Sequence, residues 1–302
     1  MRVLGKDNPS VTQYVRSLRG GSQPILAQAS DGQVYVVKFT NNLQGPNLPF
    51  NECMGIELYR SCGLAGPSWK PLMVSESFLE NNPDCWMQTP EGSRRPASGL
   101  CFASRFLGGH GRRLLEILPA TSFQRVRNRS GFWLAWLIDI LAAHADNRQA
   151  VFEQDADGWL DAYFIDHGHL FGGPNADLKK NFQVSRYLDP RIYQNVSSLE
   201  LLSFQKIVHD LEADQLWRVT ESLPDDWKSA SATDGFAQFL DRLGTSSLVQ
   251  NVLDSMLDCL QRMTALESRN FQSGRKPPCP VLRTGVQEAE FEQVRVNYPA
   301  CA

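Results

Sequence analysis

An apolar run near the middle of the chain predicts a buried helix. Residues 132–143 (FWLAWLIDILAA) are almost all apolar and are flanked by polar residues, a pattern typical of a helix that is buried on most of its faces. Two short β-prone runs follow, at 150–152 and 163–165, with a turn signal at 155–158 between them. The pattern therefore predicts a helix that leads into a β-hairpin.

The N-terminal part of the chain is patterned mainly as strands. Residues 24–29 and 34–39 are β-prone and enclose a turn, which predicts a first β-hairpin. After a polar connector, the apolar spacing predicts a helix over 52–62, with Asn51 as its N-cap. The same patterns predict the remaining elements: strands at 69–74 and 99–107, a loop insertion at 80–98, and amphipathic helices within 198–222 and 234–268.

Composition and charge exclude several classes of function. The chain has 302 residues, of which 42% are hydrophobic, and a formal net charge of −3, so we expect no nucleic-acid partner. No apolar run approaches the roughly 20 residues of a membrane span, and the N-terminus lacks the apolar core of a signal peptide. We therefore expect a cytoplasmic protein without a membrane span. The seven cysteines include no Cys-x-x-Cys pair, which argues against a zinc site or a disulfide framework.

Two aspartates mark the open ends of the central hairpin. Asp146 precedes its first strand and Asp166 follows its second, so the hairpin can bring the two carboxylates together. Phosphoryl transfer needs one carboxylate to orient the attacking hydroxyl and accept its proton, and another to hold the magnesium ion on the phosphates. Asp146 suits the first role and Asp166 the second. Asp166-His167-Gly168 also looks like the Asp-Phe-Gly metal-binding signature of protein kinases.

A lysine and a glutamate nearer the N-terminus extend this pattern. Lys38 lies at the end of a predicted strand, on the same face as Val34 and Val36. A strand lysine followed by a helix glutamate is the order in the nucleotide lobe of kinases, where the carboxylate pairs with the lysine and the lysine holds the phosphates. Glu52 is the first candidate for this carboxylate and Glu57 the second.

Taken together, the chain resembles the HipA-like kinases, a bacterial branch of the protein-kinase-like fold that is also similar to the phosphatidylinositol 3- and 4-kinases. The resemblance spans roughly residues 20–265. Short segments carry it: Val36-Val37-Lys38-Phe39, Asn51-Glu52, Ala65-Gly66-Pro67, Ser104-Arg105-Phe106, the Trp-rich helix into Asp146, and Ile165-Asp166.

The resemblance implies an α+β, two-lobed protein-kinase-like fold. Its small lobe is expected to hold an antiparallel sheet and one helix, and its larger lobe to be mainly helical. We expect the nucleotide lobe over residues 1–108, the catalytic helical lobe over 109–270 and a loosely ordered tail over 271–302.

The resemblance also implies ATP and Mg²⁺ as cofactors and a role for each candidate residue. The family usually has an asparagine five residues after the catalytic aspartate as a second metal ligand, but this chain has Val151 there. Either Gln149 or Asn147 substitutes for it, or the second metal site is degraded. The implied roles are phosphate binding by Lys38, support of that lysine by Glu52, catalytic proton transfer by Asp146 with Gln149 beside it, and metal binding by Asp166.

The nucleotide is expected to contact two further segments. Backbone groups of Ser104, Arg105 and Phe106 lie where the hinge between the lobes is expected, and there they could bind an adenine edge. A Gly-rich phosphate loop is lacking, and the nearest candidate is the stretch that contains Gly21 and Ser22. Both assignments depend on position along the chain.

The leading hypothesis is a kinase that transfers the γ-phosphate of ATP to a Ser or Thr hydroxyl of a protein. A lipid or small-molecule kinase is an alternative, as is a nucleotide-binding pseudokinase or scaffold, which Val151 favours. A third alternative is a metal-dependent hydrolase that uses His144, Asp146 and His167. The sequence leaves open the phosphoacceptor, any autophosphorylation site and the oligomeric state.

Overall fold

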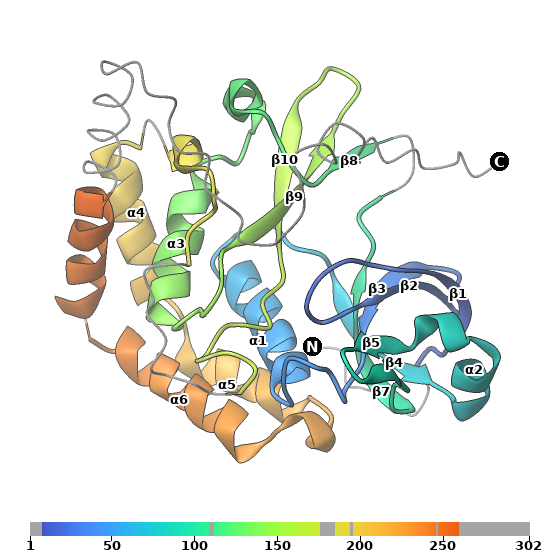
Figure 1. The fold of residues 1–302 in the computed structure, drawn as a ribbon. Helices are drawn as coiled ribbons and strands as arrows, with labels where there is room; N and C mark the ends of the chain where they lie inside the picture. The colour runs from blue at the N-terminus through green and yellow to red at the C-terminus, as the bar shows by residue number, and fades with distance from the viewer. Residues whose placement is uncertain (1–7, 109–111, 176–184, 194–195, 246, 260–302) are drawn as a thin grey trace. The chain divides into compact units, whose positions relative to one another are not determined.

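The computed structural model describes residues 8–108, 112–175, 185–193, 196–245 and 247–259 (Figure 1). Residues 1–257 form one compact unit and residues 258–302 a second, so nearly all described residues belong to the first. The predicted tail lies outside the described residues, and the predicted lobe boundary after residue 108 stays a prediction. Among the described residues, no helix is long and apolar enough to cross a membrane.

A five-stranded antiparallel sheet forms the N-terminal part of the fold, with the strand order β1-β2-β3-β7-β4. The predicted first hairpin is present as β2 and β3. Its turn contains Gly32 with a φ of 75°, a left-handed conformation that glycine adopts without a Cβ penalty. The strands are β1 (Val11–Ser17), β2 (Ile25–Ala29), β3 (Val34–Lys38), β4 (Trp69–Val74) and β7 (Gly99–Arg105).

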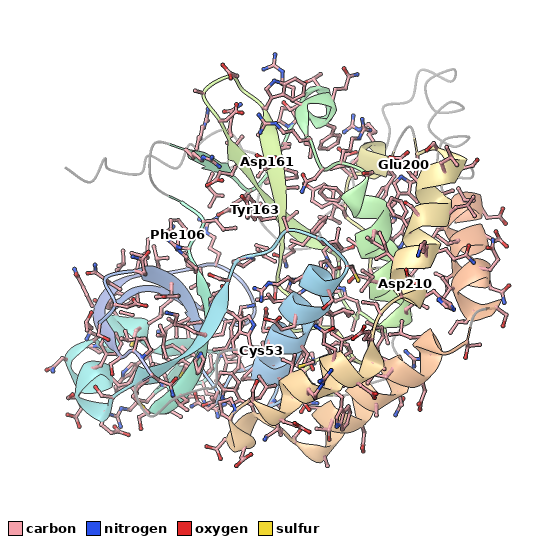
Figure 2. All side chains as sticks on the ribbon, turned by 180° about the vertical axis from the view of Figure 1, so that it is seen from behind. Cys53, Phe106, Asp161, Tyr163, Glu200 and Asp210 are labelled. Atoms are coloured by element: carbon pink, nitrogen blue, oxygen red, sulfur yellow. The ribbon has the colours of Figure 1, made fainter. Side chains whose placement is uncertain are left out.

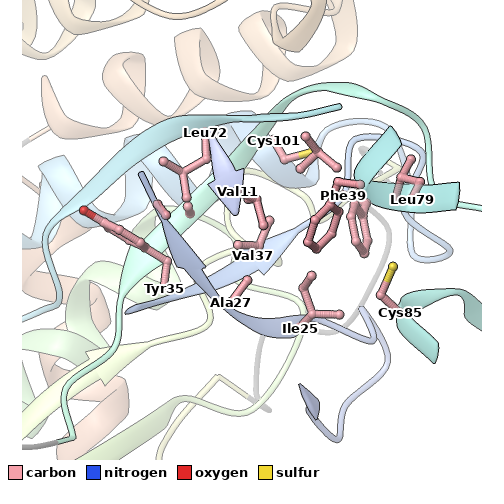
Figure 3. Close-up of a cluster of buried hydrophobic side chains, with 14 residues drawn as sticks. Val11, Ile25, Ala27, Tyr35, Val37, Phe39, Leu72, Leu79, Cys85 and Cys101 are labelled. Atoms are coloured by element: carbon pink, nitrogen blue, oxygen red, sulfur yellow. The ribbon is translucent and has the colours of Figure 1, made fainter. Parts of the chain in front are cut away.

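One face of this sheet packs into a hydrophobic core with the short helix α2 (Glu76–Asn81). Figure 3 shows Val37 and Phe39 in this core together with Leu79 of α2. Burial of such side chains stabilises the fold by about 25 cal/mol per Å² of apolar surface. Because strand residues alternate between faces, Lys38 points to the opposite face of the sheet, where it meets α1.

Helix α1 (Leu48–Ser61) lies between the sheet and the helices that follow later in the chain (Figure 1). Phe50 packs edge-on against Phe236 of α6 at a centroid distance of 6.0 Å, and the Tyr59 hydroxyl lies 3.3 Å from the carbonyl oxygen of Ala135 in α3. Residues 247–259 are also helical. The other helices are α3 (Gly131–Leu141), α4 (Ser198–His209), α5 (Ala213–Glu221) and α6 (Ala230–Leu243).

A second antiparallel sheet carries the predicted central hairpin. Its order is β10-β9-β8, formed by β8 (Arg113–Leu115), β9 (Gln149–Gln154) and β10 (Leu160–Ile165). Gln149 lies opposite Ile165, so the residues just before β9 and just after β10 meet at one end of this ribbon. The fold is therefore mixed α+β with antiparallel sheets, as predicted.

The structure corrects three local predictions. Helix α1 begins at Leu48 with Asn47 as its N-cap, because Pro49 is compatible with a first helical turn, whose N–H groups have no helical partner. The predicted loop insertion at 80–98 begins within the last turn of α2 and contains the small hairpin of β5 (Met87–Thr89) and β6 (Gly92–Arg94). The lobe expected to be mainly helical, over 109–270, also contains β8 near its start, a strand that is too short to show alternation in the sequence.

Candidate active site

Three charged side chains from separate elements meet on the face of the five-stranded sheet opposite its core. Lys38, at the end of β3, pairs with Glu52 of α1 and also donates to Oδ1 of Asp166 at 2.9 Å. Asp166 directly follows β10. The structure thus brings together the three residues that the sequence singled out from segments far apart in the chain.

Glu52 also holds the backbone beside Asp166. Its two carboxylate oxygens accept hydrogen bonds from the N–H of His167 at 3.1 Å and of Gly168 at 3.0 Å. The second candidate carboxylate, Glu57, lies elsewhere: it binds Arg60 at 2.6 Å and the indole N–H of Trp69 at 2.7 Å. Glu52 is therefore the residue that links Lys38 to the Asp166 segment.

The backbone is unusual where the two loops of the site meet. Asp166 has a φ of 59°, Ala143 a φ of 53° and Phe171 a φ of 55°, all in the left-handed region. This region is uncommon for residues other than glycine, and such conformations tend to cluster at functional sites, where the surrounding structure holds them in place. Here the loops are joined by a hydrogen bond from the N–H of Phe171 to the carbonyl of Ala142 at 2.7 Å.

The charges of this cluster suit a divalent cation. Burial opposes the charge of Lys38, but the carboxylates of Asp166 and Glu52 outweigh it and raise the pKa of the ammonium above its ordinary value. Burial would favour neutral Asp166, yet Lys38 holds the pKa of this carboxyl well below its usual range. Burial raises the pKa of Glu52 although Lys38 opposes the shift, so Asp166 is the carboxylate whose negative charge is favoured. The Asp166 side chain is 26% exposed, against 8% for Lys38 and 3% for Glu52, so it is the oxygen donor that a cation can reach.

The candidate second metal ligand lies beside Asp166. Gln149, the first residue of β9, donates from Nε2 to Oδ2 of Asp166 at 2.9 Å, and its amide oxygen is the hard donor type that Mg²⁺ accepts. Val151 lies within β9 opposite Tyr163 and is 7% exposed, so it belongs to the core. Asn147 is partly buried in the loop before β9.

Asp146 lies in the same loop, which is fixed by two contacts. Nδ1 of His144 donates to the carbonyl of Asp146 at 2.6 Å, and the N–H of Ala145 donates to the carbonyl of His169 at 2.9 Å. Oδ1 of Asp146 accepts from the N–H of Asn147 at 2.7 Å. The loop is therefore tied to the segment after Asp166, and Asp146 is partly exposed there.

The two predicted nucleotide contacts have different outcomes. Two N–H groups at the expected hinge are already used within the sheet: Arg105 donates to the carbonyl of Ser68 and Phe106 to that of Val34. Ser104 pairs with neighbouring strands on both sides. Figure 2 shows Phe106 where the chain leaves the sheet. The groups that could still bind an adenine edge are the backbone carbonyls of this segment or the residues after Phe106. The predicted adenine contact of Ser104, Arg105 and Phe106 stays a prediction, in which their carbonyl groups would take part.

The stretch with Gly21 and Ser22 lies close to the site. Asn42 donates to the carbonyl of Ser22 at 2.8 Å, and a Cβ on Gly21 would meet Nε2 of Gln44 at 2.7 Å. Gln44 in turn contacts Nε2 of His169 at 3.1 Å, three residues after Asp166. The loop between β1 and β2 thus approaches the Asp166 segment through Gln44.

His144 and His167, the two histidines of the hydrolase alternative, are packed into the protein interior. Burial and the neighbouring Arg148 lower the pKa of His144 to about 4 and hold that of His167 well below its ordinary value, so both are neutral near pH 7. His167 packs on the Tyr59 ring and lies 3.4 Å from the Arg148 guanidinium. Within the part of the chain that the structure describes, no group of three His, Cys, Asp or Glu residues is placed to hold a metal. This arrangement does not support the hydrolase alternative.

Three residues for which the sequence predicted no role at the site support it. Asn51 is buried and donates to the carbonyls of Gly168 and Leu170 at 3.0 and 2.9 Å, rather than capping a helix. Arg148 and Asp139 form a buried ion pair next to the Asp166 backbone. The sequence contained one signal for this pair, because Asp139 is the only charged residue in the apolar run at 132–143.

No protein-family model and no curated protein matches the chain. Among solved structures, it is similar to the Helicobacter pylori proinflammatory kinase CtkA, with 11% identity over 82% of this chain and 96% of that one and a TM-score of 0.49. It is also similar to hydra Fam20 with sugar (14% identity, 82% and 86%, TM-score 0.46) and to the Golgi casein kinase with Mn/ADP bound (16% identity, 82% and 73%, TM-score 0.40). At these TM-scores the likenesses support no conclusion on fold or function.

Proposed function

We propose that this chain is an ATP-dependent phosphotransferase of the HipA-like type that phosphorylates protein Ser or Thr hydroxyls. The observation that carries the proposal is the buried Lys38, which is held between Glu52 and Asp166. A strand lysine, a helix glutamate and an aspartate after a hairpin are the parts that position ATP phosphates and their metal in kinases.

Each residue has a definite task in this proposal. Lys38 stays charged because of its two carboxylate neighbours, and its ammonium binds phosphate oxygens. Asp166 holds Mg²⁺ together with Gln149 or Asn147, and bound Mg²⁺ would supply positive charge on the β- and γ-phosphates. Asp146 accepts the proton of the attacking hydroxyl. The hydroxyl oxygen forms the new bond to the γ-phosphorus while the bond to the bridging oxygen breaks, which releases ADP.

The remaining assignments belong to the same proposal. The adenine edge binds at the end of β7, through carbonyls of Ser104 to Phe106 or the residues after them. The β1–β2 loop with Gly21 and Ser22 covers the phosphates. Residues 1–108 act as the nucleotide lobe and 109–270 as the catalytic lobe, and the protein acts in the cytoplasm.

The test is direct transfer of a labelled γ-phosphate. The protein is incubated with Mg²⁺ and ATP radiolabelled at that phosphate, together with Ser, Thr and Tyr peptide libraries and a separate panel of phosphoinositides and small alcohols. The proposal predicts labelled Ser or Thr peptides, and a loss of at least about 100-fold in Asp146→Asn because general-base catalysis contributes on that scale. Label on lipids or small alcohols alone would instead indicate the second class of kinase.

One observation favours a pseudokinase as a second candidate function. The family's asparagine position is occupied by Val151, whose side chain is part of the β9 core and offers no metal ligand. A protein that binds ATP but transfers no label to any acceptor, itself included, would support this alternative.

A further inference from the structure

The side chain of Arg148 is buried directly behind the Asp166 backbone. Its Nε and one terminal nitrogen donate to the two carboxylate oxygens of Asp139 at 2.8 and 2.6 Å, a bidentate pair in which both side chains are at most 1% exposed. Such a pair is weak evidence for stability, because the loss of solvation on burial offsets the attraction of the charges. The presence of this buried pair therefore calls for another explanation.

The remaining terminal nitrogen of Arg148 points at the residues that lead into the site. It donates to the carbonyl of Ile165 at 2.9 Å and lies 3.3 Å from the carbonyl of Asp166. The next residue, Gln149, donates to the carboxylate of the same aspartate. Two consecutive residues of β9 and its preceding loop thus hold Asp166 from its backbone and from its side chain.

Asp166 needs such support because of its conformation. Its φ of 59° is in the left-handed region, which is strained for a residue with a Cβ. Arg148 fixes this backbone conformation because its guanidinium contacts the carbonyls of both Ile165 and Asp166. The backbone conformation at Asp166 decides whether the carboxylate of this residue faces Lys38.

The same ion pair reaches the helix that supplies Glu52. The hydroxyl of Tyr59 in α1 donates to Oδ1 of Asp139 at 2.7 Å, and the Arg148 guanidinium lies 4.9 Å from the centre of the Tyr59 ring. The cluster of Tyr59, Asp139 and Arg148 therefore joins α1, α3 and the end of β10. These elements carry two of the three charged side chains of the candidate active site.

We infer that Arg148 is a positioning residue: its guanidinium, oriented by Asp139, holds the left-handed turn at Asp166 and so presents the carboxylate for metal binding. The inference rests on the proposed function, since it assigns Asp166 to the metal. It adds a specific claim, that metal-dependent nucleotide binding depends on two residues that touch neither metal nor nucleotide.

The test uses a double variant, Asp139→Asn with Arg148→Met, in the full chain. It removes both charges together, so neither is left buried and unpaired, and the amide oxygen introduced at position 139 can still accept from Tyr59. The matched control is Arg127→Met, because Arg127 also pairs with two aspartates, Asp155 in the β9–β10 turn and Asp161 in β10, but its side chain is 43% exposed. Calorimetry measures the Kd of ADP with and without Mg²⁺ for each protein.

We expect the double variant to bind ADP at least tenfold more weakly than wild type in Mg²⁺, with a Kd within about twofold of wild type in its absence. A merely structural role would weaken both affinities alike or neither. Hydrogen exchange gives a second readout that needs no ligand: the amides of His167 and Gly168, which donate to Glu52, should lose at least tenfold of their protection while those of β2 and β3 keep theirs.

The outcomes separate the inference from the proposed function. Unchanged amide protection together with an unchanged Mg²⁺-dependent Kd in the double variant overturns the inference. If wild type itself shows no Mg²⁺-dependent ADP binding, the proposed function fails. In that case the assignment of Arg148 to metal presentation is overturned with it, whatever the exchange data show.

Discussion

Gly55 offers a sharp test of how closely helix α1 packs on the Asp166 segment. A Cβ at this position would lie 2.7 Å from Cδ1 of Leu170 and 2.8 Å from Cγ of His167, well inside ordinary van der Waals contact. Overpacking of this kind costs about 1–3 kcal/mol, whereas alanine in place of glycine within a helix gains about 1 kcal/mol. We therefore expect Gly55→Ala to lower the free energy of unfolding by about 1 kcal/mol, and Tm by a few degrees. Urea and thermal denaturation measure both quantities.

The matched control is Gly244→Ala, at the C-terminal end of α6. A Cβ there would meet its nearest neighbour, the carbonyl oxygen of Asp241, at 3.5 Å, which is ordinary contact. That variant should keep the stability of wild type within about 0.5 kcal/mol. If Gly55→Ala proves as stable as wild type or more stable, α1 does not press on His167 and Leu170, and the packing described for the site is wrong.

Three further predictions concern the site. Between pH 6.5 and 4, His144 is protonated in the unfolded chain but stays neutral in the folded protein, so the free energy of unfolding should decrease by up to about 3 kcal/mol as the pH is lowered. Urea titrations should show a smaller decrease for His144→Asn, and an equal decrease would contradict the prediction. Asn51→Ala should lose about 1–3 kcal/mol in urea denaturation, because two buried carbonyls lose their donor; a loss below 0.5 kcal/mol would refute this role. Val151→Asn should destabilise the protein by about 1–3 kcal/mol without tightening Mg²⁺-dependent ADP binding in calorimetry; tighter binding would show that position 151 can still serve the metal.

Local patterns were enough to predict the elements that carry the site. Alternation and turn residues predicted the β2–β3 and β9–β10 hairpins, and the apolar run predicted α3, because these signals lie within short windows. The start of α1 was missed because Asn51 and Asn47 are equally good caps in isolation. In the structure Asn51 donates to the carbonyls of Gly168 and Leu170. These partners lie more than 100 positions further along the chain, so the sequence around Asn51 cannot indicate them.

The candidate site was predictable only in part for the same reason. Lys38 and Asp166 are 128 positions apart, and their order along the chain suggested an association that the structure shows as a hydrogen bond. Backbone groups of Ser104, Arg105 and Phe106 were expected at an adenine, and the structure shows that the N–H groups of the last two are hydrogen-bonded to Ser68 and Val34. Arg148 was missed because it lies in a polar loop, where nothing in the sequence distinguishes a buried arginine from an exposed one.

The central claim is that Asp166 holds a metal ion on a bound nucleotide. Calorimetric titration of ATP into wild type and Asp166→Asn, each with and without Mg²⁺, tests it most directly. The account predicts that Mg²⁺ tightens ATP binding to wild type at least tenfold and that Asp166→Asn abolishes this dependence, because the neutral amide lacks the charge that attracts the cation. ATP binding to wild type that ignores Mg²⁺, or a dependence on Mg²⁺ that survives in Asp166→Asn, would contradict the claim.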